Sequence, residues 1–402
     1  MTRILLLRTI TAVVFCGCSP SSTNADMPVH ELPCVSLPGT VPLKEALRDV
    51  ACLKGDAVVD VSRLSADEAQ AALSTLRKVD GVLTLKATGL PQALTISVEH
   101  AAGLVIEAKG AKRLSFPKLK SVGTVDIRGG GHLSFGELRR ANAITAEVDR
   151  LGQLWLPQLT SVERGLVSNA HGTWLTRLER VGSLVVDGSQ YVPVQTVFAP
   201  LLKSATRIRV GGLRRHKEEV GRPLFDALTA VADTLEVEVV GTNDVVHLPK
   251  LQKAKQLRFA DPNGQGTLRV DLPQLRLAQT LWAKQGVRLL RAPQLTALDT
   301  LKTTSRAALT VELKALERLK TLHMQHTPDG TVVVMPKVGA LDVATFLECD
   351  AKRIAIDANI TEMGTLGVHR SRLEDFPFSK LRKLTTLNTK SIRLKVPAQL
   401  LP

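Results

Sequence analysis

Two histidines, His323 and His326, stand three residues apart in the tetrapeptide HMQH, a spacing that two ligands of one metal ion could use. A protein metal site needs at least a third ligand, and no suitable residue accompanies them in the sequence. His323 also falls at an outward place on an expected strand. We interpret both as surface histidines, and we predict neither a metal site nor a cofactor.

Charged side chains recur at matching places further along the chain. Asp271, Arg291 and Glu312 follow one another at intervals of 20 and 21 residues. If each interval is one coil of a β-solenoid, with coils about 4.8 Å apart, the two carboxylates lie near the roughly 6.5–9.5 Å separation of inverting glycosidases. Arg291 between them favours a simpler interpretation, a ladder of alternating charges. An enzyme that acts on polysaccharides is the alternative function that this row leaves open.

Other catalytic motifs are absent from the sequence. It has no glycine-rich phosphate loop with a lysine, no G-x-S-x-G nucleophile motif and no C-x-x-C pair. We therefore predict no catalytic residues and a protein that is not an enzyme.

Aromatic side chains form a more informative row. The sequence has only three tryptophans, and Trp155, Trp174 and Phe198 occupy the same outward place in three successive repeats. Exposed aromatic rows mark binding surfaces, and flat rings suit the apolar faces of sugars. The long loop that follows carries Arg214 and Arg215. These five residues are our candidate ligand-binding site, and the alternative is that the rings are packed or covered by the loop.

These places are defined by a repeat of about 22 residues. In the phrase LSFPKLKSVGTVDI, Leu119 is followed by apolar residues at +3, +6 and +8, namely Val122, Val125 and Ile127. The same spacing starts at Leu178, Leu202, Leu251, Leu316 and Ile360, and weaker copies start at Leu76, Val98, Leu138, Leu159, Leu228, Leu275, Leu295, Val338 and Leu381. A period of this size, kept through most of the chain, is typical of a solenoid.

Each repeat predicts one coil made of strand, corner, strand and turn. Apolar residues at −5 and −3, such as Leu114 and Phe116, alternate with an outward residue at −4, as in a strand. Proline at −2 in seven repeats, for example Pro117, ends that strand because proline has no N–H to donate. The residues at +6 to +8 form a second short strand. We therefore predict a mainly β fold, a right-handed parallel β-solenoid of about fifteen coils over residues 76–402.

The repeated phrase resembles sequences of the leucine-rich-repeat superfamily and is most similar to the receptor L-domain and its fungal cell-wall and bacterial relatives. The resemblance extends from about Leu73 to the C-terminus, and it implies an irregular β-solenoid that binds ligands or sits in a cell wall. Regular leucine-rich repeats carry an asparagine three residues after the last apolar strand residue, where this chain has Gly130, Ser189 or Pro262. That difference favours the L-domain form over a horseshoe with helices.

Residues 1–18 resemble the signal peptide of a bacterial lipoprotein. Two arginines, Arg3 and Arg8, precede an apolar run from Thr9 to Phe15, and small residues then lead to Cys18. In such proteins the cysteine is diacylated and becomes the mature N-terminus, and a following Ser19 resembles a signal for sorting to the outer membrane. The alternative is an ordinary cleaved secretory signal. We expect an exported protein, held on the bacterial cell envelope by lipid on Cys18, with residues 19–30 as a flexible tether.

The segment of residues 31–75 is predicted to cap the N-terminal end of the solenoid, which would otherwise expose unpaired strand edges. Cys34 and Cys52 could form a disulfide in an oxidising compartment, the alternative being two free thiols. Ser65 with Glu68 is a capping-box pattern, which predicts a helix as far as Leu76. The last twelve residues predict an edge strand.

The charge of the chain bears on its partners. A formal net charge of +15, or +13 without the two arginines of the signal segment, favours anionic partners, although a merely soluble basic surface explains it equally well. The best-supported function is a non-enzymatic envelope lipoprotein whose solenoid face binds a glycan, an anionic envelope polymer or a protein. A purely structural envelope role is an alternative. Nucleic acid is disfavoured because export is expected and only 3% of residues are aromatic.

Overall fold

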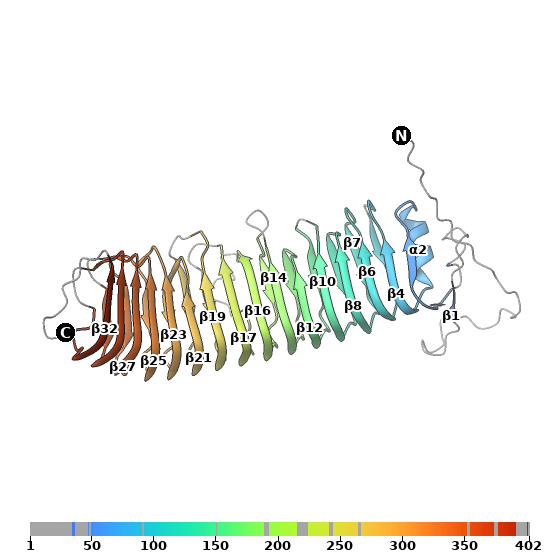
Figure 1. The fold of residues 1–402 in the computed structure, drawn as a ribbon. Coiled ribbons are helices and arrows are strands. Elements are labelled where there is room, and N and C mark those ends of the chain that lie inside the picture. Colours follow the sequence, from blue (N-terminus) through green and yellow to red (C-terminus); the bar gives the residue numbers. More distant parts are fainter. Residues whose placement is uncertain are drawn as a thin grey trace, which may run out of the picture. The chain divides into compact units, whose positions relative to one another are not determined.

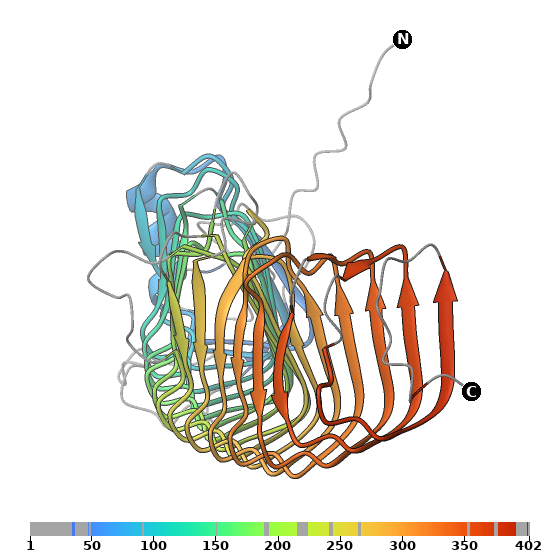
Figure 2. The same cartoon turned by 90° about the vertical axis from the view of Figure 1, so that its left-hand side faces the viewer.

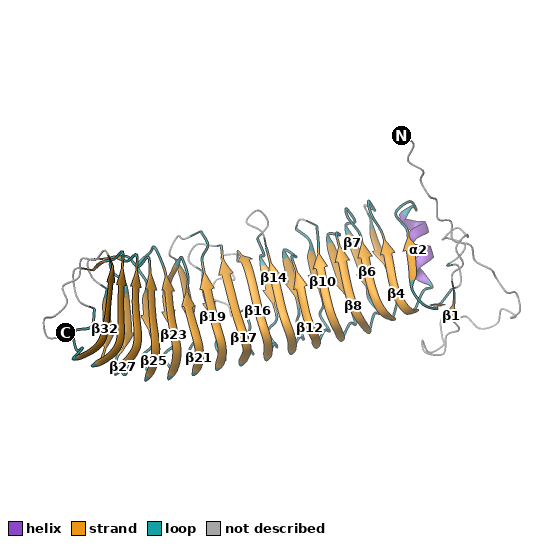
Figure 3. Cartoon of the chain, in the orientation of Figure 1, coloured by secondary structure: helices purple, strands orange, loops and turns teal. Residues whose placement is uncertain are grey.

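The protein folds as a parallel β-solenoid of about 15 coils, and 56% of the residues that the structure describes lie in strands and 3% in helix (Figure 3). The computed structural model describes residues 34–36, 47, 50–90, 92–149, 151–188, 193–214, 224–240, 244–263, 267–351, 354–373, 377–390 and 400. The predicted mainly β solenoid is confirmed, while its right-handed path stays a prediction. The chain divides into an N-terminal unit (Met1–Leu178) and a C-terminal unit (Glu179–Pro402).

The N-terminal unit contains two rows of parallel strands, one long and one short (Figure 1). The long row consists of β4 (Lys78–Lys86), β6 (His100–Glu107), β8 (Ser121–Arg128), β10 (Arg140–Glu147) and β12 (Ser161–Ser168). The short row consists of β5 (Ala93–Thr95), β7 (Arg113–Phe116), β9 (His132–Phe135), β11 (Gln153–Trp155) and β13 (Gly172–Trp174). Each coil therefore supplies one strand to each row, as the repeat predicts.

A bend in each long strand explains the +3, +6 and +8 spacing of the repeat. In β8, Val122, Val125 and Ile127 are buried, whereas Gly123 and Thr124, between the first two, both lie outside the core. Two consecutive outward residues interrupt the strict alternation of a flat strand, so the chain changes direction there and continues pairing. The second strand of this coil, β8, is thus eight residues long. The prediction assigned only the residues at +6 to +8 to this strand and was therefore too short.

The core of the N-terminal unit consists of like side chains stacked from coil to coil. Phe116 and Phe135 face each other across β7 and β9, and both are fully buried. Their rings stack with centroids 5.0 Å apart and an interplanar angle of 7°. The register of the parallel strands thus converts a repeated apolar position in the sequence into a continuous column of packed side chains.

The C-terminal unit is built in the same way (Figures 1 and 2). Its long row consists of β14 (Arg180–Asp187), β16 (Ser204–Leu213), β17 (Ala230–Val239), β19 (Lys253–Ala260), β21 (Leu277–Ala283), β23 (Ala297–Thr304), β25 (Arg318–Gln325), β27 (Ala340–Leu347), β30 (Glu362–His369) and β32 (Lys383–Lys390). Its short row consists of β18 (Val245–His247), β20 (Leu268–Asp271), β22 (Val287–Arg291), β24 (Thr310–Glu312), β26 (Val332–Met335) and β29 (Ala355–Ala358). The remaining strands are β15 (Thr196–Phe198) and the pair β28 (Asp350–Ala351) and β31 (Arg372–Leu373).

Helix α2 (Ala66–Ser74) confirms the predicted helix and its capping box. The backbone N–H of Glu68 donates to Ser65 Oγ at 3.3 Å, and the backbone N–H of Ser65 donates to Glu68 Oε2 at 3.2 Å. These bonds satisfy two donors that a helix start leaves without an intrahelical partner. The helix ends at the C-cap Thr75, one residue before the predicted limit at Leu76.

The side chain of Gln70 joins helix α2 to β5, the strand at the edge of the short row. Gln70 Nε2 donates to the carbonyl oxygen of Thr95, and the N–H of Thr95 donates to Gln70 Oε1, both at 2.8 Å. A side-chain amide has the same donor and acceptor as a peptide group. Gln70 therefore gives Thr95 the two hydrogen bonds that a further strand would have given it.

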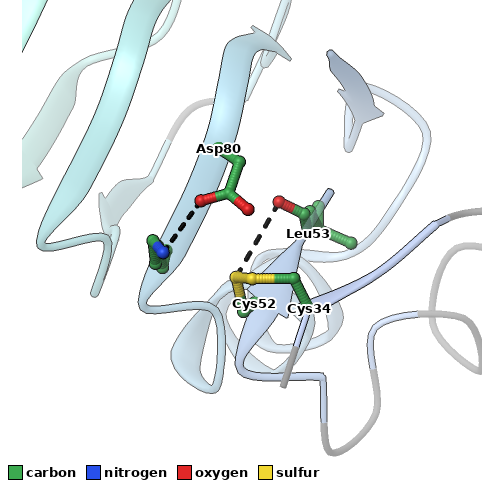
Figure 4. The surroundings of a disulfide bond; sticks show 5 residues. Cys34, Cys52, Leu53 and Asp80 are labelled. Carbon is green, nitrogen blue, oxygen red and sulfur yellow. Dashed lines mark hydrogen bonds and ion pairs between the residues drawn. A yellow bond between two sulfur atoms is a disulfide. The ribbon is translucent and has the colours of Figure 1, made fainter. Parts of the chain in front are cut away.

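The predicted disulfide is present. Cys34 of β1 (Cys34–Val35) and Cys52 of β2 (Cys52–Leu53) face each other on parallel strands, with Cα atoms 4.4 Å apart (Figure 4). Both β2 and β3 (Ala57–Asp60) pair with β4. The disulfide thus joins β1 to β2, which itself pairs with β4, the first strand of the long row.

Three predicted features lie outside the described residues. They are the signal segment with Cys18, the tether of residues 19–30, and the terminal edge strand beyond Lys390 apart from Leu400. Within the part of the chain that the structure describes, no helix has the length and apolar character needed to cross a membrane.

Candidate ligand-binding site

Trp155 and Trp174 form a stacked pair on the short row of the N-terminal unit. They are register partners on β11 and β13, and their ring centroids lie 4.7 Å apart with an interplanar angle of 24°. Trp155 is 43% exposed and Trp174 is half-buried. The neighbouring Leu154 and Thr173 point inward and are buried. Strand alternation therefore places both rings on the outer surface, and the coil spacing brings them into contact.

The residues two places before each tryptophan shape the pair. A β-carbon at Gly172 would overlap the ring of Trp174, so the ring lies directly over the Gly172 backbone. At the matching place in the preceding coil, Gln153 Oε1 accepts a hydrogen bond from Trp155 Nε1 at 3.4 Å. Neither Gly172 nor Gln153 is among the predicted site residues. The available signal was their position, because residues two apart on a strand lie on the same face.

On the side of Trp155 away from Trp174, the row continues with small hydroxyl side chains. The aligned residues on β9, β7 and β5 are Ser134, Ser115 and Thr95. A serine is too short to cover an indole ring, in agreement with the exposure of Trp155. This surface combines an apolar ring with hydroxyl groups that donate and accept hydrogen bonds. The apolar face and the hydroxyl edge of a sugar match that combination.

The other predicted site residues belong to the C-terminal unit or are not described. Phe198 ends β15 and is 45% exposed. Arg214, directly after β16, is exposed, and its backbone N–H donates to the carbonyl oxygen of Val194 at 2.7 Å. Among the described residues, no cation–π contact joins Arg214 to Phe198, and Arg215 lies outside them.

The predicted charge row lies in the C-terminal unit, and its carboxylates contact basic side chains of neighbouring strands. The predicted residues Asp271, Arg291 and Glu312 align on β20, β22 and β24, and His247 on β18, which was not predicted, precedes Asp271 in the row. Asp271 Oδ2 lies 2.9 Å from His247 Nδ1, and Glu312 Oε2 lies 3.3 Å from Arg291 Nε. Each carboxylate is therefore engaged by a neighbouring basic group.

The histidines of the HMQH segment do not share a metal site in the described structure. His323 is half-buried on β25, while His326 Nδ1 lies 3.4 Å from Glu348 Oε2. Within the described ranges, one cluster has three groups close enough for a metal ion, formed by Cys34, Cys52 and Asp80. Its two sulfur atoms are bonded to each other, and Asp80 pairs with Lys78 at 2.9 Å (Figure 4). A disulfide sulfur is not a thiolate, so this cluster is no zinc site.

A shallow groove of about 310 Å³ lies over the first residues of β8, β10 and β12. Its lining includes Arg140, Asn142, Ser161 and Glu163, and no aromatic residue. Small-molecule sites are lined mainly by apolar and aromatic side chains, with a few polar groups among them. The tryptophan pair, rather than this groove, is therefore the better candidate site.

Comparisons with known proteins add no family to this description. No protein-family model matches the chain, and no curated protein matches its sequence.

Proposed function

We propose that the protein is a non-enzymatic carbohydrate-binding scaffold of the bacterial cell envelope. The observation that carries the proposal is the Trp155–Trp174 stack, whose outer ring is 43% exposed beside a row of hydroxyl side chains. Large exposed rings on a soluble surface mark binding sites, and indole rings supply much contact area with little loss of rotamer entropy. The ligand we propose is a neutral glycan whose sugar ring lies against Trp155, with its hydroxyls toward Ser134 and Ser115.

The paired state of the acidic row supports a binding role over catalysis. Asp271 and Glu312 each have a basic partner, so neither is poised as a catalytic acid or base. An enzyme that acts on polysaccharides is the weaker alternative. A purely structural role in the envelope predicts no ligand at all, and a binding measurement distinguishes it.

The cellular location is part of the proposal. The Cys34–Cys52 disulfide supports an oxidising compartment, as expected of an exported protein. Together with residues 1–18, which resemble the signal peptide of a bacterial lipoprotein, the disulfide supports a lipoprotein anchored to the envelope through Cys18. Ser19 favours the outer membrane. The parallel solenoid, with Gly130, Ser189 and Pro262 in the sequence at places where regular leucine-rich repeats carry asparagine, supports an L-domain-like member of the leucine-rich-repeat superfamily.

The test is binding of the full chain, in mild detergent, to a panel of neutral envelope and cell-wall glycans, followed by isothermal titration calorimetry. Trp155→Ala with Trp174→Ala should reduce affinity for a bound glycan by at least about tenfold. Val167→Ala is the matched control, because Val167 is an exposed apolar residue of the same unit (44%) on the long row. Absence of any glycan ligand, or equal binding by the double variant, would refute the proposal.

A further inference from the structure

The third tryptophan, Trp282, is surrounded by positive charge on the long row of the C-terminal unit. Its register partners are Arg258 on β19 and Lys302 on β23. Arg258 Cζ and Lys302 Nζ each lie 5.7 Å from the ring centroid, and Lys284 Nζ lies 5.0 Å from it. All three cations are within the distance at which the face of an indole ring attracts them.

The indole ring of Trp282 lies between two cations of the row, Arg258 and Lys302. Arg258 comes from the strand before Trp282 and Lys302 from the strand after it, so they approach the ring from opposite sides. Strands are about 4.8 Å apart, which separates the two positions by about 10 Å. Trp282 Nε1 donates to Thr304 Oγ1 at 3.3 Å, which fixes the ring between them. The cluster is therefore preorganised.

Acidic side chains neutralise only part of this charge. Lys284 Nζ lies 2.6 Å from Glu236 Oε1 and 3.9 Å from Glu238 Oε1. Within the described part of the chain, no carboxylate forms an ion pair with Arg258 or Lys302. Arg258 instead donates to the neutral Gln256 at 2.8 Å, and its Nε is buried without a hydrogen-bond partner.

Groups around the cluster experience the remaining positive potential. Burial and then the charge of Lys302 lower the pKa of His323, the next residue along the row. On the other side of the cluster, burial raises the pKa of Glu236. The hydrogen bond from Lys284 and the charges of Lys284, Arg209 and Arg258 outweigh burial, so the pKa of Glu236 lies below its ordinary value. Glu236, the register partner of Arg258 on β17, thus lies among three cations, of which Arg209 also pairs with Asp187 at 3.4 Å and Lys284 also approaches Glu238. Lys302 forms no ion pair with a carboxylate among the described residues.

We propose that the row Arg258–Trp282–Lys302 binds a linear acidic polysaccharide, whose carboxylate or sulfate groups pair with Arg258 and Lys302. This site is separate from the tryptophan pair of the N-terminal unit and takes a ligand of different chemistry. Guanidinium and ammonium groups form their strongest hydrogen bonds with anionic oxygens. The two charges stand in a straight line across the strands, which suits anionic groups repeated along an extended chain. Single-stranded nucleic acid also requires aromatic faces for its bases, and both sides of Trp282 are occupied by the protein's own cations.

The fluorescence of Trp282 gives a direct test. Because the chain has three tryptophans, Trp155→Phe with Trp174→Phe leaves Trp282 as the sole tryptophan. The full chain carrying these changes is titrated with polygalacturonate and dextran sulfate, with neutral dextran and an oligothymidylate as comparisons. We expect saturable changes in emission with one or both acidic polysaccharides, weakened by added salt, and none with dextran. No change with either acidic polymer, or tighter binding of the oligothymidylate, would overturn the proposal.

Charge-matched variants separate the site from general basicity. In the same background, Arg258→Gln with Lys302→Gln should weaken polysaccharide binding by at least about tenfold. Lys253→Gln with Arg318→Gln removes one lysine and one arginine charge from exposed positions at the start of β19 and β25. Because exposed charges are screened by solvent, this control should weaken polysaccharide binding by less than about twofold. Equal losses in the two variants would reduce the binding to a net-charge effect. Circular dichroism and thermal melts of both variants verify folding.

Discussion

The ring of Trp174 lies on the α-carbon of Gly172, two residues earlier in the same strand. A β-carbon at residue 172 would occupy the space of the six-membered part of the indole. The position of Trp174, and with it the 4.7 Å stack on Trp155, therefore depends on a glycine at that place. A single hydrogen in place of a side chain sets the geometry of the candidate glycan site.

Substitution of that glycine tests this dependence. Gly172→Ala should displace the Trp174 ring, weaken glycan binding by about tenfold and lower the free energy of unfolding by about 1 kcal/mol, because it overpacks the site. Calorimetric binding and a denaturant melt measure the two effects. Gly339→Ala is the control, because a β-carbon there meets no atom within 4 Å. Unchanged binding in Gly172→Ala would show that the ring position does not matter.

The contrast between core and surface rings gives a second prediction. Phe116→Ala removes a fully buried ring that stacks on Phe135, and it should lower the free energy of unfolding by about 3–5 kcal/mol. Trp155→Ala removes a ring that is 43% exposed and should cost far less. Thermal melts of the two variants give the comparison. A larger loss for Trp155→Ala would mean that the indole is a core residue, and the glycan proposal would then lose its basis.

Reduction of the disulfide gives a third prediction. The Cys34–Cys52 bond closes a segment with a sequence separation of 18, so its loss should lower the free energy of unfolding by about 3 kcal/mol through the entropy of the unfolded chain. Melts of the wild-type chain with and without reductant measure the difference, and Cys34→Ser with Cys52→Ser should abolish it. Cys349→Ala should retain it, because Cys349 is the free, buried cysteine among the described residues. Equal midpoints in both conditions would contradict the prediction.

The pH dependence of stability gives a fourth prediction. Burial raises the pKa of Glu99, but hydrogen bonds and charge from Arg77 at 2.7 Å and Lys120 at 3.2 Å outweigh it, so the pKa lies below its ordinary value of 4.5. A carboxylate with a lowered pKa in the folded state stabilises the fold above its unfolded pKa, and this contribution is lost as pH falls through the folded pKa. Glu99→Gln should therefore cost about 2 kcal/mol at pH 7, and less below pH 4.5.

Denaturant melts of Glu99→Gln and the wild-type chain between pH 3 and pH 7 measure this difference. Glu179→Gln is the control, because the Glu179–Lys203 pair is largely exposed and its loss should leave the melts unchanged. A difference between Glu99→Gln and wild type that stays constant across the pH range would show that the carboxylate charge is not the cause.

Features that depend on neighbours along the chain could be predicted from the sequence. The spacing of Leu119, Val122 and Val125 predicts a coil because the apolar type of each side chain predicts that it is buried. Ser65 and Glu68 indicate a helix start because a capping box closes within one turn. The helix and the solenoid are therefore both present where the pattern placed them. The predicted length of β8 was wrong because the first half of this strand contains two consecutive outward residues, and simple alternation does not assign such a pair to a strand.

The sequence by itself determined the repeat, the outward place of Trp155 and the type of fold, since these follow from local periodicity and the burial of apolar side chains. Tertiary structure alone decided which outward residues meet. The stack of Trp155 on Trp174, the contact of Trp174 with Gly172, and the position of Trp282 between Arg258 and Lys302 depend on register and side-chain conformation. Residues some twenty positions apart become neighbours only when the coils stack, and a shift of one residue would turn each of them to the other face.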